Sequence, residues 1–202
     1  MKSLNQYINE KLKVSKKQYN YCPKTKKELD DLLKQLLEER GWEADLNDID
    51  VSNIIDMSEL FKNMQDFNGD ISEWDVSNVT NMKNMFRSCS LFEGKCLENW
   101  NVSNVINMEN MFDSCINFNC DLSGWDVSNV KTTDSLFWSC MKFEGKGLEN
   151  WNVLNVTDMS SMFINCKKFN SDISGWNVSN VKYYDNIFYN CPLKDKYKPK
   201  FK

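Results

Sequence analysis

Apolar and polar residues alternate along this chain in two local patterns that return every 25 or 26 residues. In the copy that begins at Trp74, Trp74 and Val76 alternate with polar neighbours, which predicts a short strand with one buried face. The segment 82–89 then places apolar residues at i, i+3, i+4 and i+7, the spacing of a short amphipathic helix. Each copy therefore predicts one strand, one helix and a turn that leads to the next copy.

Tryptophan marks most of these copies. Five tryptophans follow one another at spacings of 26, 25, 26 and 25 residues: Trp74, Trp100, Trp125, Trp151 and Trp176. A sixth copy starts at Ile49, where another large apolar residue replaces the tryptophan. Such a period is typical of stacked repeats, since one unit cannot bury its apolar face alone. We expect an α/β repeat solenoid, a leucine-rich-repeat-like right-handed coil of about six strand-helix units over residues 49–193.

Two further rows of identical residues predict structural roles. An asparagine recurs in every copy at Asn53, Asn78, Asn104, Asn129, Asn155 and Asn180, and we expect its amide to bond to backbone groups at the bend. A cysteine recurs at Cys89, Cys115, Cys140, Cys166 and Cys191. Stacked helices would lie about 10 Å apart, beyond the Cα separation of roughly 7 Å that a disulfide spans, so we expect free, buried thiols. Cys96 and Cys120 lie outside this row and are the one pair to test for a bridge.

The two ends differ from the repeats. Residues 1–48 predict an N-terminal helical cap, with a first short helix near residues 4–12 and a second that opens at a capping box, Thr25 to Glu28. The leucines of 29–37 give this second helix an apolar stripe, and Gly41 marks its end. Residues 194–202 form a basic C-terminal tail, which we interpret as a solvated, frayed end.

Composition and charge exclude several classes of function. The chain has 41% hydrophobic and 13% aromatic residues, which predicts a folded protein. Residues 49–193 carry ten basic and nineteen acidic residues, so we expect no nucleic-acid partner. No apolar run of membrane-spanning length and no signal peptide is visible, so we expect no membrane partner and favour a cytoplasmic or virion-associated location over secretion.

The motif W-D-V-S-N-V-T-N-M-K-N-M-F at residues 74–86 resembles the BspA-like leucine-rich repeats, also described as the DUF285 repeat family. The resemblance covers residues 49–191, and a similar lead-in occupies residues 24–61. It implies a role in adhesion and protein binding, because members of this family are associated with bacterial surface proteins. Similar repeats also occur in phages and mobile elements.

Catalytic chemistry has little support in the sequence. There is no histidine and no nucleotide-binding, nucleophile-elbow or C-x-x-C motif, so we expect no enzyme, no cofactor and no metal. One repeat position alternates between Asp and Asn, which reads as an exposed polar row. The same row could bind Ca²⁺ through its side-chain oxygens, although its spacing matches no EF-hand loop.

We therefore predict a non-enzymatic protein-protein interaction module, adhesin-like or otherwise partner-binding. The candidate contact residues are the exposed polar row together with positions at which the copies differ: Asp75, Asn101, Asp126, Asn152, Lys131, Trp138, Leu154, Tyr183 and Tyr184. The alternative is a structural or assembly component, for example of a phage particle, that self-associates through its terminal repeats.

Overall fold

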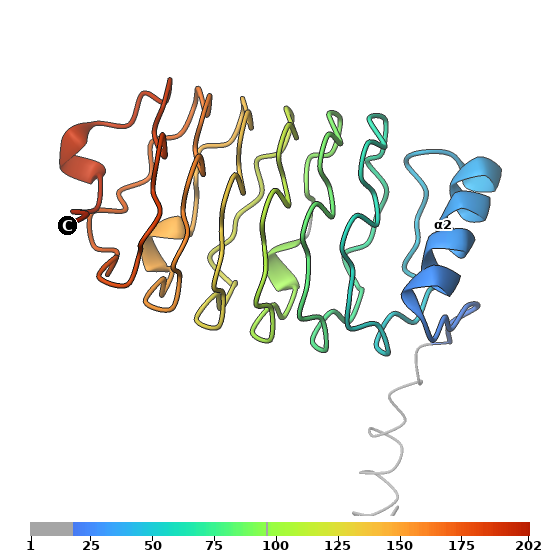
Figure 1. Cartoon of the computed structure of the whole chain (residues 1–202). Coiled ribbons are helices and arrows are strands. Elements are labelled where there is room, and N and C mark those ends of the chain that lie inside the picture. Colours follow the sequence, from blue (N-terminus) through green and yellow to red (C-terminus); the bar gives the residue numbers. More distant parts are fainter. Residues whose placement is uncertain (1–17, 96) are drawn as a thin grey trace, which may run out of the picture.

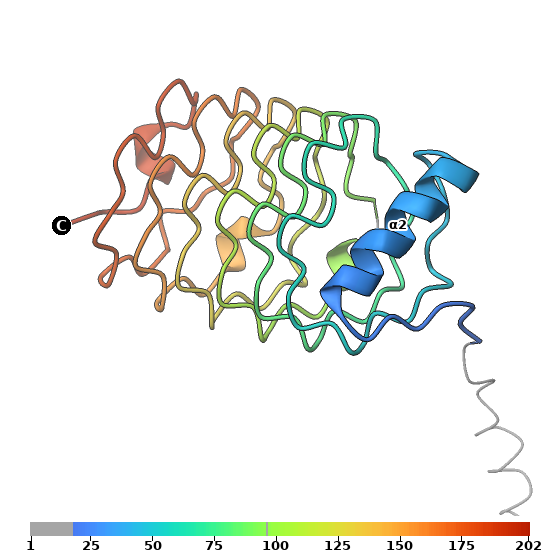
Figure 2. The same cartoon turned by 45° about the vertical axis from the view of Figure 1, so that its right-hand side comes forward.

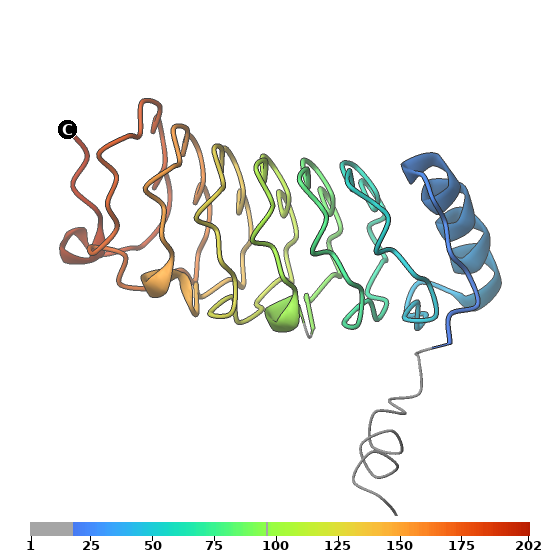
Figure 3. The same ribbon diagram turned by 90° about the horizontal axis from the view of Figure 1, so that it is seen from below.

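The computed structural model describes residues 18–95 and 97–202, and it shows successive copies of the repeat as turns of chain that lie side by side (Figure 1). Its one α-helix among these residues is α2, Lys26–Arg40. Three short 3-10 helices follow, η1 at Leu97–Asn99, η2 at Leu148–Asn150 and η3 at Asp195–Tyr197. Figure 3, a view from below, shows the turns as a single row from α2 to the C-terminal segment.

The α/β repeat solenoid of strand-helix units is wrong. No strand is formed within residues 18–95 and 97–202, where the β-type pairing consists of isolated parallel bridges. The bridges join Tyr21 to Ile49, Asp45 to Asp70, and then in succession Asp56, Asn81, Asn107, Thr132, Asp158 and Tyr183. The α-helix expected in each copy is also absent from the described turns, and short turns take its place, for example at residues 83–88. This arrangement does not have the leucine-rich-repeat architecture.

Backbone hydrogen bonds between turns explain why the expected helices do not form. In the segment 82–88, Met82 N–H donates to Asn107 O at 2.9 Å and Phe86 N–H donates to Met111 O at 2.9 Å. An α-helix would need these groups to bond to carbonyls four residues earlier in the same turn. The N–H groups instead point along the row of turns, and every turn is bonded to its neighbour.

A left-handed backbone residue makes this geometry possible. Asn84 and Ser88 have φ values of 57° and 64°, which end any right-handed helical run after two or three residues. Residues with φ between 54° and 65° recur at the same two positions of each copy: Glu59, Asn63, Asn84, Ser88, Asn110, Ser114, Ser135, Ser139, Ser161, Asn165, Asn186 and Asn190. Asparagine tolerates this conformation better than most residues, and no β-branched residue occupies either position.

The core consists of two columns of stacked phenylalanine rings. The first column is Phe61, Phe86, Phe112, Phe137, Phe163 and Phe188, with consecutive centroids 5.3 to 5.8 Å apart and planes within 13°. The second column is Phe67, Phe92, Phe118, Phe143 and Phe169. The columns contact each other: the ring centroids of Phe112 and Phe118 are 4.0 Å apart, and both residues are fully buried. The turns are therefore held by continuous aromatic contact as well as by backbone bonds.

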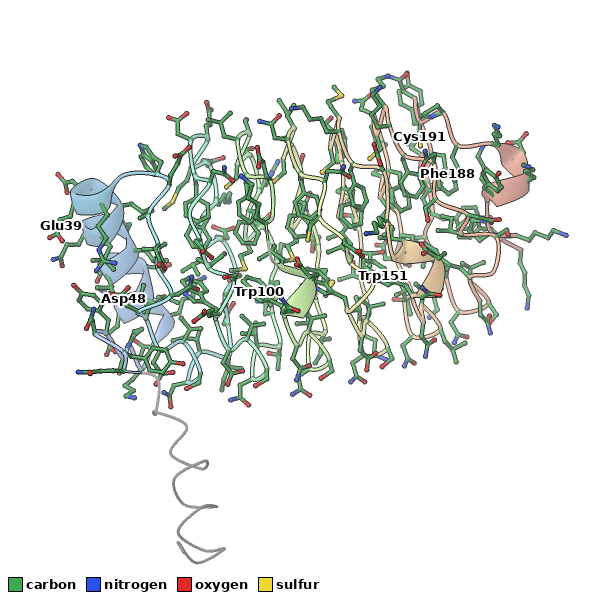
Figure 4. The ribbon with its side chains drawn as sticks, turned by 180° about the vertical axis from the view of Figure 1, so that it is seen from behind. Glu39, Asp48, Trp100, Trp151, Phe188 and Cys191 are labelled. Carbon is green, nitrogen blue, oxygen red and sulfur yellow. The ribbon has the colours of Figure 1, made fainter. Side chains whose placement is uncertain are left out.

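The tryptophan row faces inward, as the periodicity predicted. Trp100 is 2% exposed, and its indole N–H donates to Ile71 O of the preceding turn at 3.1 Å. The same bond recurs for Trp74, Trp125, Trp151 and Trp176. Figure 4 shows Trp100 and Trp151 among the side chains inside the turns. A buried indole N–H needs an acceptor, and each turn supplies one for the next.

The asparagine and cysteine rows also bond between turns. Asn78 Nδ2 donates to Ser52 O at 2.9 Å, and four later copies repeat this bond, which confirms the predicted role of the row. Cys89 Sγ lies 2.9 Å from Phe61 O, and Cys115, Cys140 and Cys166 make the equivalent contact. These four thiols are free and buried, as predicted, whereas Cys191 is only half-buried. The argument from helix spacing does not apply, because no helices stack here. Cys96 lies outside the described residues.

Helix α2 covers the first turn and confirms the second helix of the predicted cap (Figure 2). Thr25 Oγ1 accepts the N–H of Glu28 at 3.2 Å, and Gly41, with φ 84°, ends the helix. Its buried residues are Leu29, Leu33, Leu36 and Leu37. The helix expected near residues 4–12 lies outside the described residues.

The tail of residues 194–202 is not frayed, contrary to the prediction. It folds back over the last turn, where the ring of Phe201 stacks on Tyr184 with centroids 4.5 Å apart. Ile173 N–H donates to Tyr197 O at 3.1 Å, which fixes η3 against the neighbouring turn. Apolar residues alternate with the lysines of this segment, and Tyr197 and Phe201 pack against the core. Lys198 Nζ lies 5.4 Å from the ring centroid of Phe188, at the end of the first aromatic column. Both ends of the row of turns are thus covered.

Two glycines in the same local sequence provide a test of this close stacking. A Cβ atom at Gly124 would lie 2.4 Å from the carbonyl oxygen of Glu98, whereas a Cβ at Gly175 would meet nothing within 4 Å. We expect Gly124→Ala to lower the free energy of unfolding by about 1–3 kcal/mol, because a backbone carbonyl of the neighbouring turn must move. The matched variant Gly175→Ala should change it by less than about 0.5 kcal/mol. Urea denaturation measures both, and equal effects would contradict the spacing of the turns.

Candidate protein-binding edge

The polar row predicted as a contact surface has a structural role in every turn. In Asp75, Asn101, Asp126 and Asn152, the side-chain Oδ1 accepts the backbone N–H of the residue two positions later, at 2.9 to 3.3 Å. Asp and Asn both provide this oxygen, which explains why the two residue types alternate. The hydrogen bonds from Ser128 also lower the pKa of Asp126. All four side chains are exposed, and they lie in one row along consecutive turns.

The carboxylates of the described turns do not gather into a metal site. Within residues 18–95 and 97–202, no group of three or more Asp, Glu, Cys or His side chains has the geometry to hold an ion. Within the same residues, no helix is long and apolar enough to cross a membrane.

The structure separates the remaining predicted contact residues. Leu154 lies two residues after Asn152 of the polar row, is 39% exposed, and its carbonyl accepts Asn180 Nδ2 at 2.9 Å. Tyr183 lies on the line of parallel bridges, where it pairs with Asp158. Lys131 lies one residue before the line of parallel bridges, and its N–H donates to Ile106 O of the preceding turn at 2.8 Å.

Tyr184 is engaged by the folded tail. Its hydroxyl donates to Lys202 O at 3.0 Å, in addition to the ring contact with Phe201. Tyr184 therefore stabilises the end of the fold. Among the described residues, no hydrogen bond or ring contact joins Trp138 to Leu154, Tyr183 or Tyr184.

Trp138 belongs to a different surface, which we call the variable edge. This edge consists of three repeat positions, those of Arg87, Ser90 and Leu91 in the second copy. Its residues are 62, 65–66, 87, 90–91, 113, 116–117, 138, 141–142, 164, 167–168, 189 and 192–193. These positions differ in size and charge from copy to copy, in contrast to the constant polar row. Cys191, beside the edge, is labelled in the upper part of the structure in Figure 4.

The first half of the variable edge carries most of its ion pairs. Arg87 Nε pairs with Asp113 Oδ2 of the next turn at 2.9 Å. Lys62 pairs with Glu59 at 2.9 Å, and this hydrogen bond lowers the pKa of Glu59. Cations on this half are therefore neutralised by carboxylates of the same molecule.

In the second half of the edge, which we call its apolar half, apolar residues stand beside Lys142, Lys167 and Lys168. Backbone bonds place Trp138, Ile164 and Tyr189 next to one another in successive turns, since Ser139 N–H donates to Ile164 O at 2.7 Å and Asn165 N–H donates to Tyr189 O at 3.0 Å. Ile164 is 7% exposed, whereas Trp138 is 37% and Tyr189 66% exposed.

Other exposed apolar side chains extend this surface. Leu91, Ile116 and Met141 lie on the same edge, with exposed fractions of 36% to 46%. The sequence reasoning identified only Trp138 here and missed Leu91, Ile116, Met141 and Tyr189. A comparison of the copies position by position could have found them, because these are positions at which the repeats disagree. Isolated exposed apolar residues are ordinary, but a concentration along one edge is typical of an interaction site.

The thiols beside this edge are poor nucleophiles. Burial raises the pKa of Cys89 to about 12, and it raises the pKa of Cys115, Cys140 and Cys166 as well. Thiolate is the reactive form of cysteine, so these groups stay protonated and unreactive near neutral pH.

These features define a repeat protein whose turns are joined by backbone and side-chain ladders and which presents one variable, partly apolar edge. A family model described as "Mycoplasma protein of unknown function, DUF285" matches residues 30–146 and 120–198. The chain belongs to this DUF285 family. No curated protein and no solved structure shows a significant match to the sequence of this chain.

Proposed function

We propose that this protein is a non-enzymatic module that binds another protein through the apolar half of the variable edge. The observation that carries the proposal is a set of exposed apolar side chains along this edge: Ile116, Trp138 and Met141 lie in adjacent turns, and Tyr189 lies two turns further on. Aromatic residues and methionine are enriched at the centres of protein interfaces, where they supply contact area at little cost in conformational entropy. The underlying turns are bonded to one another, so the edge is a preorganised surface.

The remaining chemistry of the described residues supports binding over catalysis. The repeated Asp and Asn side chains bond to their own backbone, and the buried thiols are protonated. The resemblance of the tryptophan motif to BspA-like repeats, which are associated with adhesion and protein binding, points in the same direction. Self-association through the terminal repeats has less support, because α2 covers one end and the folded tail covers the other.

Affinity capture from extracts of the encoding organism tests this function. The immobilised protein is compared with Trp138→Lys/Tyr189→Lys, which places two charges on the apolar edge. The matched control is Ile55→Lys/Ile106→Lys, two exposed apolar residues at another repeat position. We expect the wild-type protein and the control to capture the same reproducible set of proteins. The edge variant should capture at least about tenfold less of this set. Equal capture by all three proteins, or no specific capture by any, would reject the proposed function.

A further inference from the structure

The variable edge ends in a groove that only the folded tail creates. Lys167 and Lys168 of the fourth tryptophan-type turn line this groove together with Lys194, which follows Pro192 in the chain. Phe169, Leu193 and Tyr197 provide the apolar lining. The groove has a volume of about 460 Å³ and is open to solvent, within the range of about 300–1,000 Å³ found for ligand pockets.

The charges around this groove differ from those elsewhere in the molecule. Residues 160–202 carry eight lysines and three acidic residues, whereas residues 18–159 carry 12 basic and 25 acidic residues. Lys83, Arg87 and Lys146 of the earlier turns each pair with a carboxylate within 3.0 Å.

The groove lysines have no such partners. Within the described residues, no carboxylate lies within ion-pairing distance of Lys167, Lys168 or Lys194. The one bond recorded for these ammonium groups joins Lys167 Nζ to the carbonyl oxygen of Asn190 at 3.3 Å. An acidic protein thus concentrates unpaired positive charge at one end of its apolar edge.

We propose that this groove binds an acidic peptide segment that carries apolar anchor residues. This inference rests on the proposed function and specifies the chemistry of the partner. Carboxylates of the segment pair with Lys167, Lys168 and Lys194, while an apolar side chain packs against Leu193 and Tyr197. The segment continues along the edge toward Met141 and Trp138. Exposed ion pairs are individually weak, so the lysines select and orient an acidic partner while the apolar contacts supply most of the affinity.

A protein segment fits this surface better than a polynucleotide. A nucleic-acid site needs a continuous basic track along the backbone, and the adjoining turns 18–159 are strongly acidic. The groove instead is lined by lysines together with Leu193 and Tyr197, which favours a segment that carries both acidic and apolar side chains.

Fluorescence anisotropy with a short labelled peptide of alternating glutamate, leucine and tyrosine tests this proposal. We expect the wild-type protein to bind the peptide, more weakly at high salt. Lys167→Glu/Lys168→Glu should weaken binding by at least about tenfold, because attraction becomes repulsion. The matched variant Lys24→Glu/Lys182→Glu changes the net charge equally at two exposed lysines away from the groove, and it should alter the affinity by less than about twofold. Circular dichroism verifies that both variants fold.

Several outcomes would overturn the proposal. These are absence of peptide binding, equal losses in the two charge-reversal variants, and equally tight binding of a lysine-containing peptide or of single-stranded DNA of the same length. A salt-sensitive dimer seen by light scattering, abolished by Lys167→Glu/Lys168→Glu, would replace the separate partner with a second copy of the chain. If the peptide fails while Trp138→Lys/Tyr189→Lys still abolishes capture from extracts, the acidic chemistry is wrong and the proposed function stands.

Discussion

Phe112→Ala is expected to lower the free energy of unfolding by about 3–5 kcal/mol, the usual cost of truncating a buried phenylalanine. Phe112 is fully buried, and its ring lies between those of Phe86 and Phe137, with centroid distances of 5.6 and 5.8 Å. Its centroid lies 4.0 Å from that of Phe118 in the second column. Its loss opens a cavity that interrupts the first aromatic column in mid-row. For a chain of this length the midpoint of thermal unfolding should fall by about 6–20 °C.

The end of the same column provides the control. Among the described residues, Phe188 stacks on one phenylalanine ring, that of Phe163, with centroids 5.7 Å apart, and it is half-buried. Phe188→Ala should cost less than half as much as Phe112→Ala, because a partly exposed ring loses less buried area and leaves no closed cavity. Urea and thermal denaturation followed by circular dichroism measure both variants. Equal losses would show that continuity of the ring columns does not hold the turns together.

Alkaline pH is expected to destabilise the protein steeply through the buried cysteine row. Burial raises the pKa of Cys89 to about 12 and also raises the pKa of Cys115, Cys140 and Cys166. In the unfolded chain a thiol ionises near pH 8.5. Between these values the folded state binds more protons than the unfolded state, so the stability is fully present below about pH 8.5 and falls as the pH rises. Each thiol contributes about 1.4 kcal/mol per pH unit to this fall.

Removing two of the thiols should flatten this dependence. Cys115→Ala/Cys140→Ala is expected to be less stable at neutral pH but to lose about 2.7 kcal/mol less per pH unit above about pH 9. Cys22→Ala, which removes an exposed cysteine outside the row, should leave the slope unchanged. Unfolding free energies from urea titrations between about pH 8 and pH 10, under reducing conditions, decide the question. A common slope in all three proteins would contradict the assignment of the effect to the buried row.

The spacing of apolar residues predicted burial far better than it predicted backbone conformation. Met82, Met85, Phe86 and Cys89 are all fully buried, as an amphipathic helix would require. Two compact turns separated by a left-handed residue present the same positions inward, so the side-chain pattern is common to both structures. The distinguishing hydrogen bonds go to a carbonyl about 25 residues away. A local periodicity contains no information about such a partner.

The binding edge shows the same division between local and long-range information. Trp138 was recognisable because it departs from the repeat. Its relation to Tyr189 depends on two intervening bonds between turns, which a reading of single copies does not reveal. Comparison of equivalent positions would have grouped them, since these residues are joined to neighbouring turns through backbone groups, which leave the side chain free to change from copy to copy.

The sequence by itself determined the period, the number of copies, the inward tryptophan, phenylalanine and cysteine rows, and the helix that covers the first turn. These features follow from hydrophobicity and from capping chemistry, which act over a few residues. Only the tertiary structure decided that the described turns contain neither strands nor α-helices, that the basic tail covers the last turn, and that three lysines line one groove. Each of these features depends on whether residues distant in the sequence supply a hydrogen-bond acceptor or an apolar surface to a given segment. Such contacts are a property of the assembled row of turns.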